Sequence, residues 1–437
     1  MQRQKTIAKW LIIILLCTLA VGAYIIYDTL YISGSGDASA GNDVTDNPDD
    51  NDPTFPEEPD PPYFTELPRA TQNFAGMKVA HAGGEGSDTL LDAVFTSDGT
   101  YLFFRSESEE YDCRGAGLYI AAFDDKQLLC VTRFGEADES FGGAKLTSDG
   151  IAAITSDKEN GIITVFDTTG NITGKASLPA FVDSYMYVSG TSLYVFFSDG
   201  NSLRCAVVSK GLSATTVPFL LSGDFRVREG MTTSDGFILV AEKGDDLCII
   251  HFSQNKGFNV KLTYEKTSFM QIAAVAGDEG AAFALLGKCA AGLRLAVFDT
   301  EGIAEAETVV EGASSAVLFS DGVSLTLIRT GITDTYCRHL DLISSSPTSY
   351  TIGEVVAVRS YGDTKTFVSC DANNLSVYVS KSGSEFSSLM ECNASDGKTS
   401  AAFKEGDLLL AFSTTSTEGI FFENFGDADA YLVRLPV

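Results

Sequence analysis

Three observations in the sequence predict an all-β propeller built from four-stranded blades. A unit of roughly 40 to 50 residues recurs eight times between Ser87 and the C-terminus. Most units contain four short apolar runs that are rich in β-branched and aromatic residues and separated by turn residues. The last unit lacks a fourth run, while a spare run precedes the first unit. Four strands per repeat at this period are typical of propeller blades.

The first repeat, Ser87–Phe134, displays the pattern. It reads SDTLLDAVF, the turn Thr96–Gly99, TYLFFRS, a polar loop, GLYIAAF, a second turn and QLLCVTRF. The turn after the first run recurs at intervals of 41 to 51 residues, at Asp98, Asp149, Gly190, Asp235, Asp278, Asp321, Asp363 and Gly406. Asp-Gly closes tight hairpins, because Gly accepts positive φ and Asp bonds nearby backbone. A metal-binding role is the alternative, but isolated Asp-Gly pairs lack the converging oxygens that calcium requires.

The eight turns predict eight blades. Seven blades are the alternative if the unit around Phe181–Ala214 is irregular. The last unit consists of Asp407–Phe412, a long loop and Tyr431–Leu435, and it has no fourth strand. We expect the spare run Phe74–Ala80 to supply that strand. Its pairing with the last blade would close the ring and remove an open sheet edge.

The N-terminal region predicts a membrane anchor. Residues 1–9 contain three basic residues and no acid, and the 18 residues of 10–27 carry no charge. This length spans a bilayer core, and the basic flank predicts a cytoplasmic N-terminus with the rest of the chain outside the cytoplasm. A cleaved signal peptide is the alternative, with the small residues at Val21–Ala23 as the cleavage site. We therefore expect a single-pass protein of the cell membrane.

Residues 28–68 are expected to form a disordered tether, and residues 69–437 the propeller. The tether contains 11 acids, no Lys or Arg, and many Pro, Gly, Ser and Asn residues. Such a segment buries too little apolar surface to offset its ordering entropy. With the tether and the first nine residues set aside, 27 basic and 48 acidic residues remain. This charge disfavours nucleic acid as a partner.

The sequence indicates no metal, cofactor or catalytic motif. None of the nine cysteines forms a CxxC pair, which disfavours zinc and redox sites. Buried thiols are the favoured interpretation, with a Cys113–Cys130 disulfide as the alternative. The chain has three histidines, and two of them, His251 and His339, lie in predicted third strands, away from the channel where metal ligands would have to converge.

Two long loops contain the candidate binding residues. In a propeller, the loops from second to third strands share one face. Those of the first and last units, Ser106–Ala116 and Thr414–Ala428, are long, and ring closure would make them neighbours. Exposed aromatic side chains rimmed by charge often mark interaction sites. The candidate binding residues are Glu109, Glu110, Tyr111, Phe421, Phe422 and Phe425. The alternative is that these aromatic residues pack over the closure.

The segment Ala80–Phe104, AHAGGEGSDTLLDAVFTSDGTYLFF, resembles the β-propeller repeats of bacterial exported proteins. In that group a phrase of the type GG…D…SDG closes one blade and opens the next. The later repeats of this chain lose the Gly-Gly pair. The resemblance implies a propeller displayed outside the membrane and assigns no activity, since a fold alone carries no function.

Three hypotheses of function follow. The first is a tethered extracytoplasmic binding module that recognises a protein, a peptide or an envelope polymer through the rim loops. The second is a hydrolase or lyase that uses paired carboxylates at the central channel. Raised carboxylate pKa values at the channel mouth would favour it. The third is a structural subunit of an envelope complex.

Overall fold

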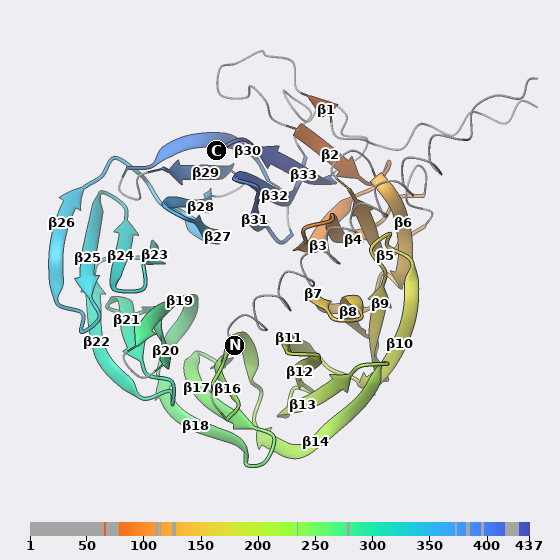
Figure 1. Cartoon of the computed structure of the whole chain (residues 1–437), viewed down its shortest axis with the longest axis horizontal. Coiled ribbons are helices and arrows are strands. Elements are labelled where there is room, and N and C mark those ends of the chain that lie inside the picture. Colours follow the sequence, from red (N-terminus) through yellow and green to blue (C-terminus); the bar gives the residue numbers. More distant parts are fainter. Residues whose placement is uncertain are drawn as a thin grey trace, which may run out of the picture. The chain divides into compact units, whose positions relative to one another are not determined.

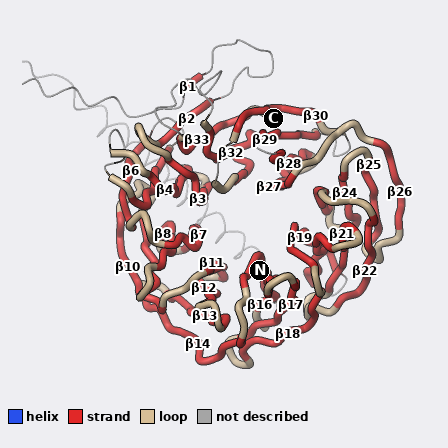
Figure 2. The backbone as a smooth tube through the Cα atoms, turned by 180° about the vertical axis from the view of Figure 1, so that it is seen from behind, coloured by secondary structure: helices blue, strands red, loops and turns tan. Residues whose placement is uncertain are grey.

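The computed structural model describes residues 65–66, 78–109, 113, 115–124, 128–233, 235–277, 280–371, 374–381, 385–394, 397–415 and 428–437. These residues belong to one compact unit. They form eight antiparallel sheets arranged as blades around a ring (Figure 1). The regular elements in this part of the chain are strands, joined by short turns and loops (Figure 2).

Each blade contains an innermost, a second, a third and an outer strand. The innermost strands are β3 (Asp88–Phe95), β7 (Ser140–Thr147), β11 (Asp183–Ser189), β15 (Arg226–Thr232), β19 (Thr267–Gly277), β23 (Ala316–Ser320), β27 (Glu354–Tyr361) and β31 (Ser400–Lys404). The second strands are β4 (Thr100–Ser106), β8 (Gly150–Ser156), β12 (Ser192–Ser198), β16 (Phe237–Lys243), β20 (Gly280–Cys289), β24 (Ser324–Arg329), β28 (Thr364–Asp371) and β32 (Asp407–Thr414).

The third strands are β5 (Gly117–Phe123), β9 (Asn160–Phe166), β13 (Ser202–Ser209), β17 (Asp246–Ser253), β21 (Gly292–Phe298), β25 (Ile332–Cys337), β29 (Asn374–Ser380) and β33 (Asp429–Leu435). The outer strands are β6 (Leu128–Gly135), β10 (Ile172–Pro179), β14 (Ser213–Ser222), β18 (Gly257–Tyr264), β22 (Ala304–Glu311), β26 (Leu342–Pro347), β30 (Ser387–Asn393) and β2 (Lys78–Ala82). A two-residue strand, β1 (Thr65–Glu66), pairs with β2. Blades 1 to 8 are numbered from β3 onward.

The predicted eight blades are confirmed. The unit around Phe181–Ala214 forms a complete blade of β11, β12, β13 and β14, so seven blades are excluded. The recurring turns lie between the innermost and second strands, except that Asp278 lies outside the described residues. Asp321 accepts the amide hydrogens of Val323 and Ser324, as expected for a turn residue. At Thr96–Gly99 the hydroxyl of Thr96, rather than Asp98, makes these bonds.

The ring is closed by the strand that precedes the first repeat, as predicted. Strand β2 pairs antiparallel with β33, with Ala80 opposite Leu432 and His81 opposite Tyr431. The described strand runs from Lys78 to Ala82, and residues 74–77 of the predicted run lie outside the described residues. Blade 8 is therefore assembled from both ends of the propeller sequence. We call the junction between blades 8 and 1 the closure seam.

The hydrophobic core is divided among the interfaces between neighbouring blades. Within the described residues there are eight clusters of buried apolar side chains, and each joins two adjacent blades. The second and third strands are sandwiched on both faces, which explains continuous apolar runs such as GLYIAAF, where every residue is buried. One cluster at the closure seam joins Ala80 and Leu432 of blade 8 to Leu102 and Phe104 of blade 1.

The predicted anchor and tether cannot be compared with these elements. Residues 1–9, 10–27 and nearly all of 28–68 lie outside the described part of the chain. No helix in the described part is long and apolar enough to cross a membrane. The thiol of Cys130 is free, so it forms no disulfide with Cys113. His251 lies in a third strand, as expected, whereas His339 lies between β25 and β26 rather than in a strand.

Candidate functional site

The roots of the two long loops meet at the closure seam. The carbonyl of Ser87 accepts the amide hydrogen of Glu107, which begins the loop between β4 and β5. Ser87 also forms a parallel bridge with Ala428, which ends the loop between β32 and β33. The amide of Asp88 donates to the carbonyl of Ala428 at 2.6 Å. The expected neighbourhood of these loops is therefore present at their roots.

Most of the predicted binding residues lie outside the described part of the chain. Glu109 is described and its side chain is exposed. Glu110, Tyr111, Phe421, Phe422 and Phe425 lie outside the described residues, and their role stays a prediction.

Beneath the loop roots, two carboxylates are buried side by side. Asp88 and Asp429 have no solvent-exposed surface. A Cβ added to Gly83 would come within 2.6 Å of an oxygen of each, so both carboxylates crowd the same glycine. Oδ2 of Asp88 accepts from the amide of Gly84 and the hydroxyl of Ser108, both at 2.9 Å. Burial raises the pKa of Asp88, although these bonds and others from Ser106 and Asp429 act in the opposite direction.

The central channel contains a cavity of about 570 Å³. Its lining comes chiefly from the innermost strands of blades 1, 2, 3, 4, 7 and 8, which face one another around the ring in Figure 1. Five charged side chains line it: Asp92, Lys145, Glu229, Arg359 and Lys398. No sequence pattern singles out these five residues as a site.

Irregular strand pairing precedes the acidic residues of the cavity in two innermost strands. The pairing register shifts between Leu90 and Asp92 in β3, and between Val227 and Glu229 in β15. A β-bulge of this kind re-aims the side chains beside it. Both acidic residues of the cavity directly follow such a bulge. An acid immediately after a bulge is thus the local feature that the two strands share.

Both carboxylate oxygens of Asp92 already have partners within the protein. Its carboxylate accepts the amide hydrogens of Ala93 at 2.9 Å and of Ala144 in the next blade at 3.2 Å. Lys398 Nζ lies 2.8 Å from Oδ1, and the hydroxyl of Ser400 lies 3.5 Å from it. Asp92 therefore ties blades 1, 2 and 8 together at the channel wall.

Glu229 and Tyr185 form a second polar contact across neighbouring blades. The Tyr185 hydroxyl donates to Oε1 of Glu229 at 2.5 Å, and the Gly230 amide donates to the same oxygen at 3.1 Å. Burial and the charge of Glu229 both raise the pKa of Tyr185, so its hydroxyl keeps the proton that it donates. Oε1 is therefore satisfied by two donors.

Arg359 is the charged group best placed to meet a ligand. Its Nε donates to the carbonyl of Ala401 at 2.5 Å, and Nη1 donates to that of Val358 at 2.7 Å. These bonds orient the guanidinium. Burial lowers the pKa of Arg359, while Glu229 and Asp92 raise it, so the group stays charged at neutral pH.

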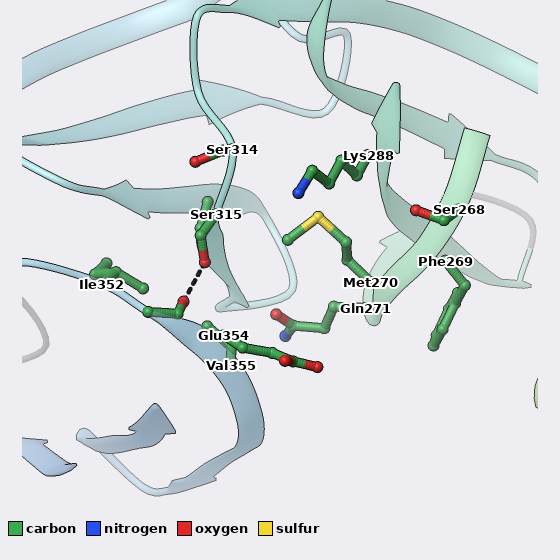
Figure 3. A pocket seen from close by; sticks show the side chains of 12 residues that line it. Ser268, Phe269, Met270, Gln271, Lys288, Ser314, Ser315, Ile352, Glu354 and Val355 are labelled. Carbon is green, nitrogen blue, oxygen red and sulfur yellow. Dashed lines mark hydrogen bonds between the residues drawn. The ribbon is translucent and has the colours of Figure 1, made fainter. Parts of the chain in front are cut away.

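A second hollow of about 500 Å³ lies between blades 5, 6 and 7 (Figure 3). Its lining includes Lys288 and Glu354 as charged residues. Gln271, which also follows a bulge, bonds both the amide and the carbonyl of Leu318 in the next blade. The hydroxyl of Ser315 donates to the carbonyl of Gly353. These polar groups serve blade packing, and this hollow gathers less charge than the channel cavity.

The described residues provide little support for the enzymatic hypothesis. Asp88 and Asp183 have pKa values raised by burial, but neither lines the channel cavity. Of the two acids in the cavity, Asp92 is held by an ion pair and by backbone amides. In this part of the chain, no three His, Cys, Asp or Glu side chains are grouped so as to hold a metal ion.

The comparisons with known proteins support the fold and nothing finer. No protein-family model and no curated protein matches the chain. The Dos1 propeller is similar in structure, with a TM-score of 0.52 and 11% identity, over 80% of this chain and 93% of that one. A computationally designed protein, Ika8, gives a TM-score of 0.48 and 10% identity over 80% and 98% of the chains. BamB from Moraxella catarrhalis gives 0.41 and 14% over 69% and 85%. The chain is a β-propeller.

Proposed function

We propose that this protein is a membrane-tethered binding module whose propeller works outside the cytoplasm and docks a protein partner. The uncharged segment 10–27 after a basic start, followed by the acidic spacer 28–68, supports the anchor and the orientation. A peptide or an envelope polymer is the other class of ligand that the same face could take. Propellers present loops from many blades on one face, which suits recognition of extended surfaces.

The meeting of the two longest second-to-third strand loops carries this proposal. Their roots are joined at Ser87, whose carbonyl accepts from the amide of Glu107, and at Asp88, whose amide donates to the carbonyl of Ala428. The corresponding loops of the other blades are short, for example Asp157–Glu159 in blade 2. The rim over the closure seam is therefore the place where the most loop sequence is concentrated. Binding residues are commonly found on loops that a rigid scaffold positions.

Capture of partners from intact cells tests the proposal. The full chain is expressed at its native surface, crosslinked and purified, beside a variant whose Thr414–Ala428 loop is replaced by Gly-Ser residues. A matched control replaces the short loop Asp157–Glu159 in the same way. We expect a protein partner that the wild type and the control capture and the loop variant loses. Equal capture by all three folded proteins would show that the rim loops are not the binding site. Capture of polysaccharide alone would show that the ligand is a polymer rather than a protein.

A structural subunit of an envelope complex predicts a different result. Its partner would copurify in fixed stoichiometry without crosslinking and would survive high salt. A binding module predicts a partner that is held reversibly. Size-exclusion chromatography of the captured material distinguishes the two.

A further inference from the structure

The channel cavity reverses the charge balance of the chain. The protein has 59 acidic and 30 basic residues. The cavity lining instead contains three basic side chains, those of Lys145, Arg359 and Lys398, against the two acids Asp92 and Glu229. One positive charge is thus in surplus inside a strongly acidic molecule. Walls of protein around a channel focus such a local field.

The acids of the cavity already have partners within the protein. Asp92 accepts from Lys398 and from two backbone amides. Oε1 of Glu229 accepts from Tyr185 and Gly230. These bonds hold the acids against the channel wall. An incoming anion therefore meets Arg359, whose charge Glu229 and Asp92 also face, and Lys145.

Arg359 retains donors for such a ligand. A guanidinium has five N–H donors. Two of them are bonded to the carbonyls of Ala401 and Val358, and the described residues accept none of the other three. The bonded donors fix the plane of the group, which lowers the entropy cost of binding. An oriented guanidinium matches a carboxylate with two parallel hydrogen bonds.

Lys145 supplies the second charge. It lies near the end of β7, lines the cavity and is exposed. No hydrogen bond or ion pair within the described chain engages its ammonium. It can therefore turn toward a bound anion.

We propose that the channel cavity binds a small organic anion through a carboxylate held by Arg359 and Lys145. The surplus of one positive charge suits a singly charged carboxylate better than a doubly charged phosphate. The cavity volume lies within the range of small-molecule sites, which is roughly 300–1,000 Å³. Tyr185 and Tyr187 contribute apolar wall, and the second oxygen of Glu229 can accept a hydroxyl or ammonium of the same ligand. This site is separate from the rim and does not depend on the proposed partner.

Saturation-transfer NMR on the purified full chain tests the site. The probes are sodium acetate and sodium D-glucuronate, with D-glucose as the uncharged counterpart of the latter. Inorganic phosphate, the doubly charged anion, has no C–H protons to observe and is added as a competitor of the acetate signal. We expect binding of both carboxylates with dissociation constants of about a millimolar, corresponding to roughly 4 kcal/mol. D-glucose should give no signal, and phosphate should bind no tighter than acetate. Failure of both carboxylates at about 20 mM, or equal signals from glucose and glucuronate, would overturn the proposal.

Variants locate the binding in the cavity. Arg359→Lys keeps the charge and loses the paired donors, so the affinity should fall about tenfold. Lys145→Gln should weaken binding about threefold, and it remains informative if Arg359→Lys fails to fold, because Lys145 has no bond to lose. The matched control is Lys158→Gln, an exposed lysine in the loop between β8 and β9, which should change nothing. Unchanged affinity in Lys145→Gln and in a folded Arg359→Lys would contradict the site.

The rim variant separates this inference from the proposed function. Replacement of Thr414–Ala428 should abolish capture of the partner and leave acetate binding unchanged. Loss of acetate binding in that folded variant would place the anion at the rim instead of in the channel.

Discussion

The closure seam and the channel cavity both contain charged or titratable side chains from distant parts of the chain. The two regions differ in how deeply these side chains are buried. At the seam, Asp88, Asp429 and His81 are at least nine-tenths buried. In the cavity, Lys398 keeps 55% of its side chain exposed and faces Asp92 as an ion pair. Burial makes ionisation costly, whereas exposure beside an opposite charge makes it nearly neutral. We therefore expect the seam to control stability and the cavity to be available for ligands.

The largest loss in the free energy of unfolding should come from removing the closure strand. Replacing Lys78–Ala82 by Gly-Ser residues removes the ladder with β33 and the burial of Val79, Ala80 and Ala82. The loss should exceed about 4 kcal/mol, since each buried apolar side chain contributes up to a few kcal/mol. Chemical denaturation measures it.

A matched control is available in another outer strand. All six residues of β26 are exposed, so the same replacement at Leu342–Ser346 should cost much less. Equal losses in the two variants would show that β2 is an ordinary outer strand rather than the closure of the ring.

The second effect is a dependence on pH that begins at His81. Burial lowers the pKa of His81 from 6.5 to about 4. Its contribution to stability is complete above pH 6.5 and is lost as the pH falls toward 4, because the unfolded chain binds the proton more readily. Near pH 5 the loss is on the order of 2 kcal/mol. His81→Phe should remove this part of the pH dependence in thermal unfolding.

The exposed His339 provides the control, since His339→Phe should leave the pH profile of stability unchanged. A wild-type profile that is flat between neutral pH and pH 5, with no difference from His81→Phe, would contradict the burial of His81.

A smaller effect of opposite sign should come from the carboxylate pair. Burial raises the pKa of Asp88, so its contribution to stability is present at low pH and lost as the pH rises through its folded value. Asp88 and Asp429 share a hydrogen bond, so one of the two buried carboxyls has to keep a proton, whereas Asp429→Asn supplies a donor that needs no bound proton. At neutral pH this variant should be more stable by about 1 kcal/mol, and the gain should shrink on acidification. A variant that is less stable than the wild type at neutral pH would rule out the charge conflict.

The smallest effect should come from the ion pair in the cavity. Lys398→Met removes a half-exposed partner of Asp92, whose backbone bonds remain. The loss should be less than about 1 kcal/mol in chemical denaturation. A loss as large as that of the closure-strand variant would erase the distinction between the two regions.

The sequence predicts the ring well because the information is local. In the sequence, each blade is marked by a tight turn and continuous apolar runs. The last unit is the one that lacks a fourth strand, so the spare run before Ser87 can pair there. The cavity could not be predicted in the same way. Asp92, Glu229 and Arg359 lie in three different blades, and their convergence depends on ring geometry and on bulges that no spacing encodes. A charged residue inside an innermost strand, as in RVREGMT, is the signal that could have drawn attention to the channel.

Amide hydrogen exchange in the folded full chain tests the central claim, that the strand before the first repeat closes the ring and so brings the loop roots together. We expect the β2 amides that bond β33 to exchange as slowly as those of β33, and Asp88, bonded to Ala428, to be protected with them. Replacement of Lys78–Ala82 should release protection in β33 and at Asp88 together. Exchange of β2 amides at the rate of an unfolded chain, with β33 still protected, would contradict the claim.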